Sequence, residues 1–226
     1  MAIVSVDVTQ LEESTLESVT VLKLGNSYAV KQGDIIVALG SPAGMAHSVN
    51  YGFVSYVLRN VQVADGVTRL LYADVKGNAN KGTFLVNASG EMIGWVTDQY
   101  KNEGSEDMTV IMPISDYKSI LEKMSNGIPV PYLGIKGQEV TVAMTDNGLP
   151  FGVYVTDSIA NGPAYNAGIQ NGDIITKVGE KEIATIKDYQ NAVENLRQGE
   201  VVNVIIQRNG IEEYKELEYQ VTVGAR

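Results

Sequence analysis

The sequence predicts a mainly β protein made of two consecutive domains. A chain of 226 residues with 44% hydrophobic residues can bury one large core or two modest ones. Short apolar runs separated by glycine-rich turns fill the first half, which is typical of a barrel or sandwich. A helical apolar stripe then ends at Gly127, and Ile128-Pro-Val-Pro131 cannot continue a helix. We therefore expect a β-barrel domain over residues 1–127 and a second β domain with two short helices over residues 128–226.

Composition excludes several function classes. The net charge is −10, from 27 acidic and 17 basic residues without a Lys/Arg cluster, so nucleic acid and anionic membrane surfaces are poor partners. There is no cysteine, which rules out disulfides and thiolate zinc sites. No apolar run approaches the roughly 20 residues that cross a bilayer. We expect no membrane insertion by this chain and no cofactor.

The first domain begins with an expected strand at Ala2–Asp7. The apolar run Ile35–Leu39 has the length and flanking turns of a fully buried strand. A β-hairpin is expected where Asn78–Asn87 is followed by a reversal and the apolar run Gly90–Val96. Further strands are expected at Val49–Leu58, Thr68–Val75 and Met108–Met112.

A helix is expected after the last of these strands. Ser115 is its predicted cap, and its apolar positions follow the spacing of one buried stripe. These positions are Tyr117, Ile120, Leu121 and Met124.

The second domain offers three local patterns. Val153 and Val155 alternate inward on a strand, and Pro163–Ala167 forms a short helix that Gly168 closes. Thr185 and Asp188 form the pattern of a capping box. The helix that follows carries Ile186, Tyr189, Ala192, Val193 and Leu196.

Two stretches of the first domain resemble chymotrypsin-like serine proteases of the HtrA (DegP) family. One is Gly33-Asp-Ile-Ile-Val-Ala-Leu-Gly-Ser-Pro-Ala-Gly44, and the other is Ala79-Asn-Lys-Gly-Thr-Phe-Leu-Val-Asn87. In the family the second stretch reads Gly-Asn-Ser-Gly-Gly-Pro-Leu-Val-Asn and holds the nucleophilic serine. The resemblance implies the second lobe of a chymotrypsin-like barrel. It also implies that the catalytic histidine and aspartate belong to a first lobe that would precede residue 1.

The resemblance places a lysine where the nucleophile would stand. The degenerate turn consists of Ala79, Asn80, Lys81 and Gly82, and a register shifted by two residues puts Ala79 at the serine position. A lysine cannot form an acyl-enzyme ester. The glycines and the proline that would curl the backbone into an oxyanion hole are also replaced. We expect no serine-protease activity from this chain.

The second domain resembles a PDZ domain of the bacterial protease-associated type. The resemblance rests on Gly152-Val-Tyr-Val-Thr156, Gly162-Pro-Ala-Tyr-Asn-Ala-Gly-Ile169 and Asn171-Gly-Asp-Ile-Ile-Thr-Lys-Val178. It implies a groove that binds a peptide C-terminus, with a carboxylate-binding loop at Tyr132, Leu133, Gly134 and Ile135. Ile135, Tyr189 and Val193 would line an apolar pocket. Tyr189 and Val193 share one helix face, which the alternative of a plain core also requires; the groove is the favoured interpretation.

Other polar residues are weaker candidates. His47, the only histidine, is expected in a surface loop rather than in a triad. Lys81 could act as the base of a Ser-Lys dyad, but no matched serine lies near it in the sequence, so a solvated or ion-paired lysine is expected. Asp74, Asp98, Glu106 and Asp107 lack any metal-ligand spacing, and no metal site is expected.

These expectations define one leading function and two alternatives. The leading one is an inactive HtrA-like protease remnant that binds polypeptide C-termini or extended segments, for scaffolding or quality control. The second is a serine endopeptidase whose remaining lobe lies upstream of this chain. The third is a structural module that forms oligomers, a trimer by resemblance. The family resemblance also implies a bacterial, extracytoplasmic location.

Overall fold

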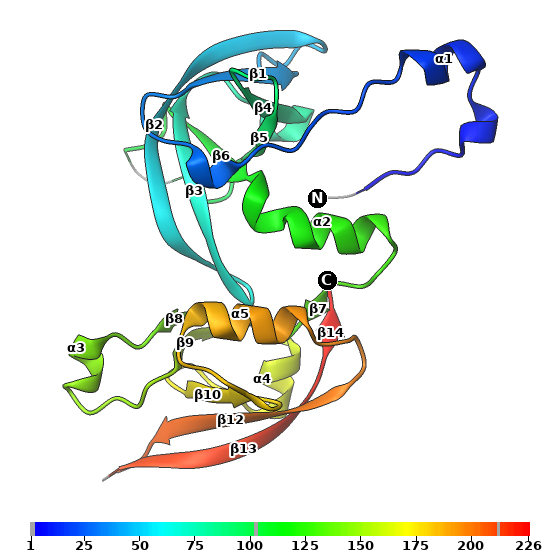
Figure 1. Ribbon diagram of the computed structural model, residues 1–226. Helices are drawn as coiled ribbons and strands as arrows, with labels where there is room; N and C mark the ends of the chain where they lie inside the picture. Colours follow the sequence, from blue (N-terminus) through cyan, green and yellow to red (C-terminus); the bar gives the residue numbers. More distant parts are fainter. Residues whose placement is uncertain (1–2, 102–103, 212) are drawn as a thin grey trace. The chain divides into compact units, whose positions relative to one another are not determined.

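A computed structural model describes residues 3–101, 104–211 and 213–226 (Figure 1). The chain divides into two compact units. The first unit comprises Met1–Arg59 and Arg69–Ser125, and the second unit comprises Asn60–Thr68 and Asn126–Arg226. Asn60–Thr68, called the hairpin tip below, contains the end of strand β2 (Ser48–Val63), a turn and the start of strand β3 (Gly66–Asp74), while the rest of both strands belongs to the first unit. None of the helices in the described residues is both long and apolar enough to span a bilayer.

The first unit is built on a closed barrel whose strands follow the order β1-β2-β3-β6-β5-β4 (Figure 1). The pairs β1–β2, β1–β4, β3–β6, β4–β5 and β5–β6 are antiparallel, and β1 closes the barrel by pairing with both β2 and β4. The strands are β1 Ile35–Gly40, β2 Ser48–Val63, β3 Gly66–Asp74, β4 Thr83–Asn87, β5 Met92–Thr97 and β6 Thr109–Pro113. The predicted hairpin is the β4–β5 pair. The mainly β fold class predicted from the sequence is confirmed.

Apolar side chains from the barrel strands fill one core. Its buried members are Ile36, Ala38, Val54, Leu71, Ala73, Val75, Leu85, Ile93, Val96 and Ile111. The prediction that Ile35–Leu39 is fully buried is wrong. Ile36 and Ala38 point into this core, whereas Ile35 on the other face is 63% exposed. A barrel strand has one inward and one outward face, so an unbroken apolar run does not make both faces buried.

The predicted strand at Ala2–Asp7 is also wrong for its described part. Residues 3–7 are not in a strand, and Ala2 lies outside the described residues. Val4 is 85% exposed, so its apolar side chain packs on no sheet. A β-strand needs a pairing partner, and none of the strands in the described residues pairs with this segment. The chain instead continues into η1 Val8–Gln10 and α1 Glu13–Ser18, and later η2 Ser27–Ala29.

The predicted helix after β6 is present but starts differently. A 3-10 turn, η4 Ile114–Tyr117, leads directly into α2 Lys118–Ser125. Ser115 therefore lies inside the turn and does not cap the helix. Its hydroxyl accepts a hydrogen bond from Ser27 N (2.9 Å), and its own N–H donates to Ser27 Oγ (2.9 Å). This pair of bonds joins η4 to η2, the 3-10 turn before β1.

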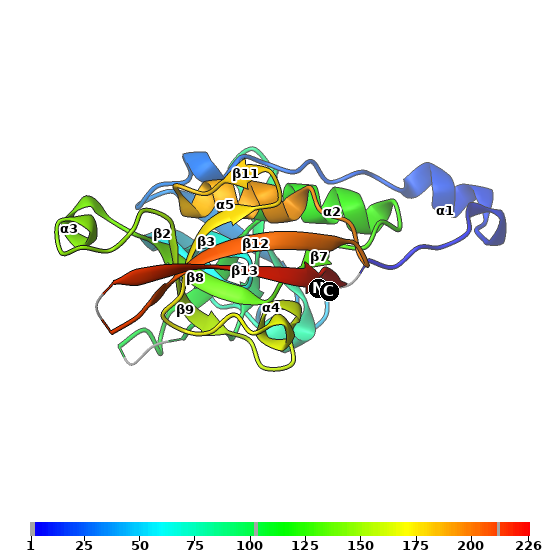
Figure 2. The same ribbon diagram turned by 90° about the horizontal axis from the view of Figure 1, so that it is seen from below.

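The second unit contains a six-stranded sheet with the path β13-β12-β10-β9-β8, to which β11 adds beside β10. In the view of Figure 2, α5 and α4 lie on opposite sides of β12 and β13. The sheet strands are β8 Ile135–Glu139, β9 Val153–Ser158, β10 Ile174–Val178, β11 Lys181–Glu182, β12 Val201–Asn209 and β13 Tyr214–Thr222. The short pair is β7 Pro131–Tyr132 with β14 Gly224–Ala225, and the helices are α3 Val142–Thr145, α4 Pro163–Ala167 and α5 Ile186–Glu194.

The local predictions for the second unit are confirmed. Val153 and Val155 are fully buried on β9. The short helix α4 has Pro163 in its first turn and ends at Gly168. Thr185 and Asp188 form the capping box of α5, whose buried residues are Tyr189, Ala192 and Val193. These elements surround a second apolar core that includes Leu133, Ile135, Ile169, Ile175, Val204 and Val221.

Candidate functional site

The degenerate nucleophile turn is a single 3-10 turn, η3 Ala79–Lys81, between β3 and β4. Asn78 caps it, because its side-chain oxygen accepts a hydrogen bond from Lys81 N (3.1 Å). The Asn78 backbone is held as well, by donating to Thr83 Oγ1 (3.1 Å) and accepting from it (3.0 Å). The backbone N–H at the nucleophile position is therefore already satisfied inside the turn. An oxyanion hole needs such donors to point at the substrate.

Among the described residues, the pocket beside this turn contains no acid–base partner. The side chains of Asn80 and Lys81 are exposed, and Lys81 forms no ion pair within the part of the chain that the structure describes. A pocket of 610 Å³ adjoins the turn at Ala79, Gly82 and Thr83, and none of its lining residues is ionisable. Proton transfer by a side chain in this pocket is therefore not available.

The remaining polar candidates are at exposed positions. His47 is exposed in the loop between β1 and β2, where it adopts a positive φ of 59°. Asp74 ends β3 at an exposed position, and Asp98 forms an exposed ion pair with Lys101 (3.8 Å). No group of three or more ligand-type side chains gathers among the described residues.

The predicted carboxylate-binding loop holds a carboxylate from the chain itself. The backbone N–H groups of Leu133, Gly134 and Ile135 all donate to the side chain of Asp65, at 3.0, 3.0 and 3.1 Å. Gly134 also reaches the second oxygen at 3.2 Å and has a positive φ of 86°, which lets three successive N–H groups face one anion. The loop is therefore an anion cradle in this structure.

Tyr189 completes the cradle from α5. Its hydroxyl donates to Asp65 Oδ1 at 2.9 Å, and its side chain is fully buried. Burial is the main cause that raises the pKa of Tyr189 well above its ordinary range, and the charge of Asp65 and the hydrogen bond to it add to the effect. Tyr189 thus stays a neutral hydrogen-bond donor at physiological pH.

The structure brings most of the predicted groove residues together. Leu133, Ile135, Tyr189 and Val193 are buried in one cluster of the second unit, and Tyr132 is half-buried beside them. Burial alone suits both a groove lining and a plain core. The polar end of this cluster, where Tyr189 meets the loop, has chemistry that a plain core lacks.

Asp65 is the site residue that the sequence did not reveal. It occupies the two-residue turn between β2 and β3, with a positive φ of 60°, and is only 5% exposed. The Asp65-Gly66 pair is a turn signal, and Asp tolerates a positive φ. That signal predicts the turn but not its target, which lies about seventy positions further along the chain at Leu133–Ile135.

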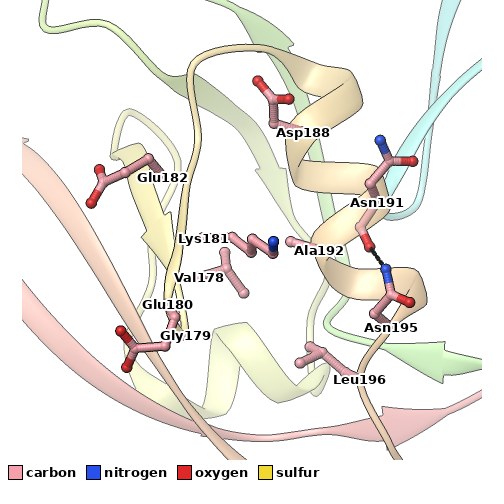
Figure 3. Close-up of a pocket in the computed structure, with 10 residues that line it drawn as sticks. All are labelled: Val178, Gly179, Glu180, Lys181, Glu182, Asp188, Asn191, Ala192, Asn195 and Leu196. Carbon is pink, nitrogen blue, oxygen red and sulfur yellow. Dashed lines mark hydrogen bonds between the residues drawn. The ribbon is translucent and has the colours of Figure 1, made fainter.

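A pocket of 650 Å³ in the second unit lies between α5 and the β10–β11 turn (Figure 3). In Figure 3, Asp188 and Asn191 line it from α5, with Lys181 opposite. Hydrogen bonds from Thr185 lower the pKa of Asp188, whose carboxylate accepts from Thr185 N (2.9 Å) and Thr185 Oγ1 (2.7 Å). The one acidic side chain that α5 contributes to this pocket is thus engaged in the helix cap.

The two units together define a class of protein in which a barrel lobe of the chymotrypsin type is joined to a PDZ domain. The family model described as "PDZ domain" matches residues 131–221. The Bacillus subtilis (strain 168) protein "Serine protease Do-like HtrB" is 29% identical over 224 residues, covering 90% of this chain and 49% of the relative. The Pseudomonas fluorescens protein "Probable periplasmic serine endoprotease DegP-like" is 32% identical over 212 residues, covering 91% and 44%.

Solved structures agree with these relatives. The structure titled "HtrA-type protease AlgW with tripeptide" is similar at 25% identity and a TM-score of 0.58, covering 91% of this chain and 69% of that one. A serine endoprotease from Yersinia pestis is similar at 26% identity and a TM-score of 0.55, covering 92% and 68%. The chain is a homologue of the HtrA/DegP serine proteases and corresponds to the C-terminal part of their protease domain plus a PDZ domain. It spans about half the length of the two curated relatives described above.

Proposed function

We propose that this protein binds the C-termini or extended apolar ends of other polypeptides through the groove of its PDZ domain. The observation that carries the proposal is the convergence of the Leu133, Gly134 and Ile135 N–H groups on one carboxylate. A peptide C-terminus presents the same two oxygens. Beside the loop, β8 begins at Ile135 and could accept a peptide as an added strand. Tyr189 and Val193 then supply the side-chain pocket.

We further propose that the barrel does not carry out serine-type proteolysis. Lys81 stands at the position of the nucleophile by resemblance, and its N–H donates to Asn78 rather than facing outward. Neither a hydroxyl nucleophile nor a free oxyanion donor is thus offered at that residue. The retained function would be scaffolding or protein quality control without cleavage.

A pair of labelled peptides tests the binding proposal. Both end in the same apolar residues, one with a free carboxylate and one with a C-terminal amide. Titration by fluorescence anisotropy should give saturable binding of the free acid and none of the amide. Gly134→Ala should abolish this binding, because an added Cβ at φ 86° strains the loop and meets the Tyr132 ring.

The matched control for that variant is Gly148→Ala. Gly148 has nearly the same φ, 89°, but lies in the exposed turn after α3, where an added Cβ meets nothing within 4 Å. It imposes a similar backbone strain away from the loop, so it should leave binding unchanged. Equal binding of the acid and the amide would contradict the proposal.

A second candidate function is a serine endopeptidase whose other catalytic lobe belongs to a longer protein. The observation that favours it is that the relatives are named as serine proteases and that this chain spans about half their length. Labelling of the full-length protein by a fluorophosphonate probe, abolished by substitution of one serine within these 226 residues, would favour this candidate over the first.

The proposed location and oligomeric state of this protein are based on its similarity to its relatives. A related protein is named as periplasmic, and we propose an extracytoplasmic location for this one. We also propose a homo-oligomer, a trimer by family resemblance. Light scattering over a range of protein concentrations would give a constant mass of three chains if this is correct.

A further inference from the structure

We infer that the hairpin tip is an internal ligand of the carboxylate-binding loop, so that a peptide C-terminus can enter the groove only when Asp65 has left it. The inference rests on the proposed function, because it describes how that same groove is controlled. It follows from three sets of contacts, all within the second unit.

The first set is the carboxylate contact itself. Asp65 Oδ1 accepts from Gly134 N, Ile135 N and Tyr189 Oη, while Oδ2 accepts from Leu133 N and Gly134 N. Every donor that could hold a terminal carboxylate at this loop is therefore already used. Two carboxylates cannot share these donors, because they would repel each other at contact distance.

The second set is the backbone contact beside the carboxylate. Asp65 N donates to Ile135 O at 2.7 Å, next to the point where the Ile135 N–H holds its side chain. A peptide that adds to a sheet edge makes a main-chain bond of this kind at the residue bearing its carboxylate. Asp65 differs from such a residue by one methylene, since its carboxyl group is attached through Cβ. It thus reproduces both parts of the recognition.

The third set consists of lateral contacts that hold the tip in place. Gln62 Oε1 accepts from Thr156 Oγ1 on β9 (2.6 Å), and Gln62 Nε2 donates to Gln138 Oε1 on β8 (3.4 Å). On the other side, Arg226 Nη1 donates to Ala64 O (3.0 Å). Figure 1 shows the tip as the turn between β2 and β3 beside α5. The strand that leads into Asp65 is therefore held against β8, the edge strand with which a peptide would pair, and against its neighbour β9.

These contacts set up a competition rather than a permanent block. The Gln62–Thr156 contact is part-buried, but the Gln62–Gln138 and Arg226–Ala64 contacts are solvent-exposed, and exposed hydrogen bonds exchange readily with water. When only a fraction of the molecules has the tip released, the apparent dissociation constant equals the intrinsic one divided by that fraction. A variant that releases the tip should thus bind peptide more tightly, although it adds no contact to the peptide.

The test is Asp65→Asn in the full chain, with the acid and amide peptides described above. Asn tolerates the positive φ of this turn, but its NH₂ group must face at least one of the loop donors, so docking of the tip is weakened. Affinity for the free-acid peptide should rise by about tenfold or more, as expected if the released fraction is about 10% or less in the unmodified protein. The amide should not bind to either protein.

Two further variants make the result decisive. Asp146→Asn removes one negative charge from an exposed position of the same unit without touching the loop, so it should leave affinity unchanged. Gln62→Ala loosens the tip without altering the carboxylate or the groove donors, so it should raise affinity severalfold. It decides the matter if circular dichroism shows that Asp65→Asn is unfolded.

The outcomes separate the inference from the function on which it rests. Tighter binding by Asp65→Asn or Gln62→Ala, but not by Asp146→Asn, supports the internal ligand. Equal, carboxylate-dependent affinity in the unmodified protein and in both tip variants overturns it and leaves the groove function intact. No carboxylate-dependent binding in any of the proteins contradicts the groove function, and the inference falls with it.

Discussion

The Tyr189 side chain combines an apolar ring in the core with a hydroxyl group that takes part in the candidate site. Its ring packs in the core of the second unit, while its hydroxyl donates to Asp65. A buried tyrosine hydroxyl needs a partner, and here the partner is a charged group that three N–H groups also hold. The same contact gives the protein a stability that depends on pH.

The first prediction concerns Tyr189→Phe. Below pH about 10, tyrosine is protonated in both the folded and the unfolded chain, so its contribution to stability is fully present. Above that pH the unfolded chain loses the proton, whereas burial and Asp65 keep it on folded Tyr189. The unfolded state then binds fewer protons, and the free energy of unfolding falls as pH rises.

Urea unfolding at several pH values measures this effect. Tyr189→Phe should lower the free energy of unfolding at neutral pH by about 2 kcal/mol, because it removes a hydrogen bond to a charged group. It should also show a shallower loss of stability above pH about 10. Tyr165→Phe, at an exposed side chain, controls for removal of a hydroxyl as such. Parallel pH curves for the Tyr189 variant and the unmodified protein would refute the assignment.

The second prediction concerns the ion pair of Arg208 with Asp173. Asp173 is almost fully buried, and both of its oxygens accept from Arg208, at 2.7 and 2.8 Å. Arg208→Met leaves that carboxylate buried without its cation, which typically costs about 3 kcal/mol or more. Lys177→Met, which removes a more exposed ion pair with Glu182 (3.4 Å), should cost less than about 1 kcal/mol. Comparable losses in chemical unfolding would argue against a special role of burial.

At the residue scale, the sequence predicts side chains whose partners are close along the chain. The Asn171-Gly-Asp173 pattern indicates a turn entering a strand, and the structure adds the local bond from Gln170 N to Asp173 Oδ2 (2.8 Å). The partnership with Arg208 joins residues 35 positions apart, and that of Asp65 with Tyr189 joins residues 124 apart. Turn propensity depends on adjacent residues and therefore cannot predict contacts between residues so far apart in the sequence.

At the scale of elements, the confirmed predictions rest on patterns of residues that are close together in the sequence. The Thr185–Asp188 pattern is confirmed as a capping box, and the hydrophobic spacing of α5 places Tyr189 and Val193 on its buried face. Within the described part of the strand predicted over residues 2–7, residues 3–7 form no strand, because alternation of apolar residues does not supply a neighbouring strand. Ser115 failed as a cap because its hydroxyl is engaged with Ser27, a residue of another element.

The third prediction belongs to α5, the helix that positions Tyr189. Thr185 Oγ1 accepts from Asp188 N (3.1 Å), so Thr185→Ala removes one of the two reciprocal cap bonds. It should lower the free energy of unfolding by about 1 kcal/mol. Thr141→Ala is the matched control, because Thr141 is the N-cap of α3 but makes no side-chain cap bond. A chemical denaturation series should show a smaller effect for Thr141→Ala, and equal effects would count against the cap.

At the scale of the whole molecule, the sequence could predict the fold class and the PDZ resemblance because each rests on several motifs within one stretch of chain. It could not predict that Asn60–Thr68 groups with the second unit. That grouping depends on the length of the hairpin, since β2 alone has 16 residues. The alternation of apolar residues in β2 does not predict which residues its C-terminal end contacts. The sequence alone shows that Lys81 stands at the nucleophile position of the turn. The hydrogen bond from Lys81 N to the Asn78 side chain is visible only in the structure.

The last prediction addresses the barrel as a catalyst. Restoring a hydroxyl with Lys81→Ser should not create a fluorophosphonate-reactive serine in this 226-residue chain, because a serine also needs a base and oxyanion donors. The Lys81 N–H is taken by Asn78, and no ionisable residue lines the adjoining pocket. Probe labelling followed by in-gel fluorescence, with trypsin as the positive control, measures this. Labelling of Lys81→Ser that disappears when His47→Ala is added would show that the lone histidine can act as the base. That result would contradict the prediction, because a single substitution would then restore a reactive serine to the barrel.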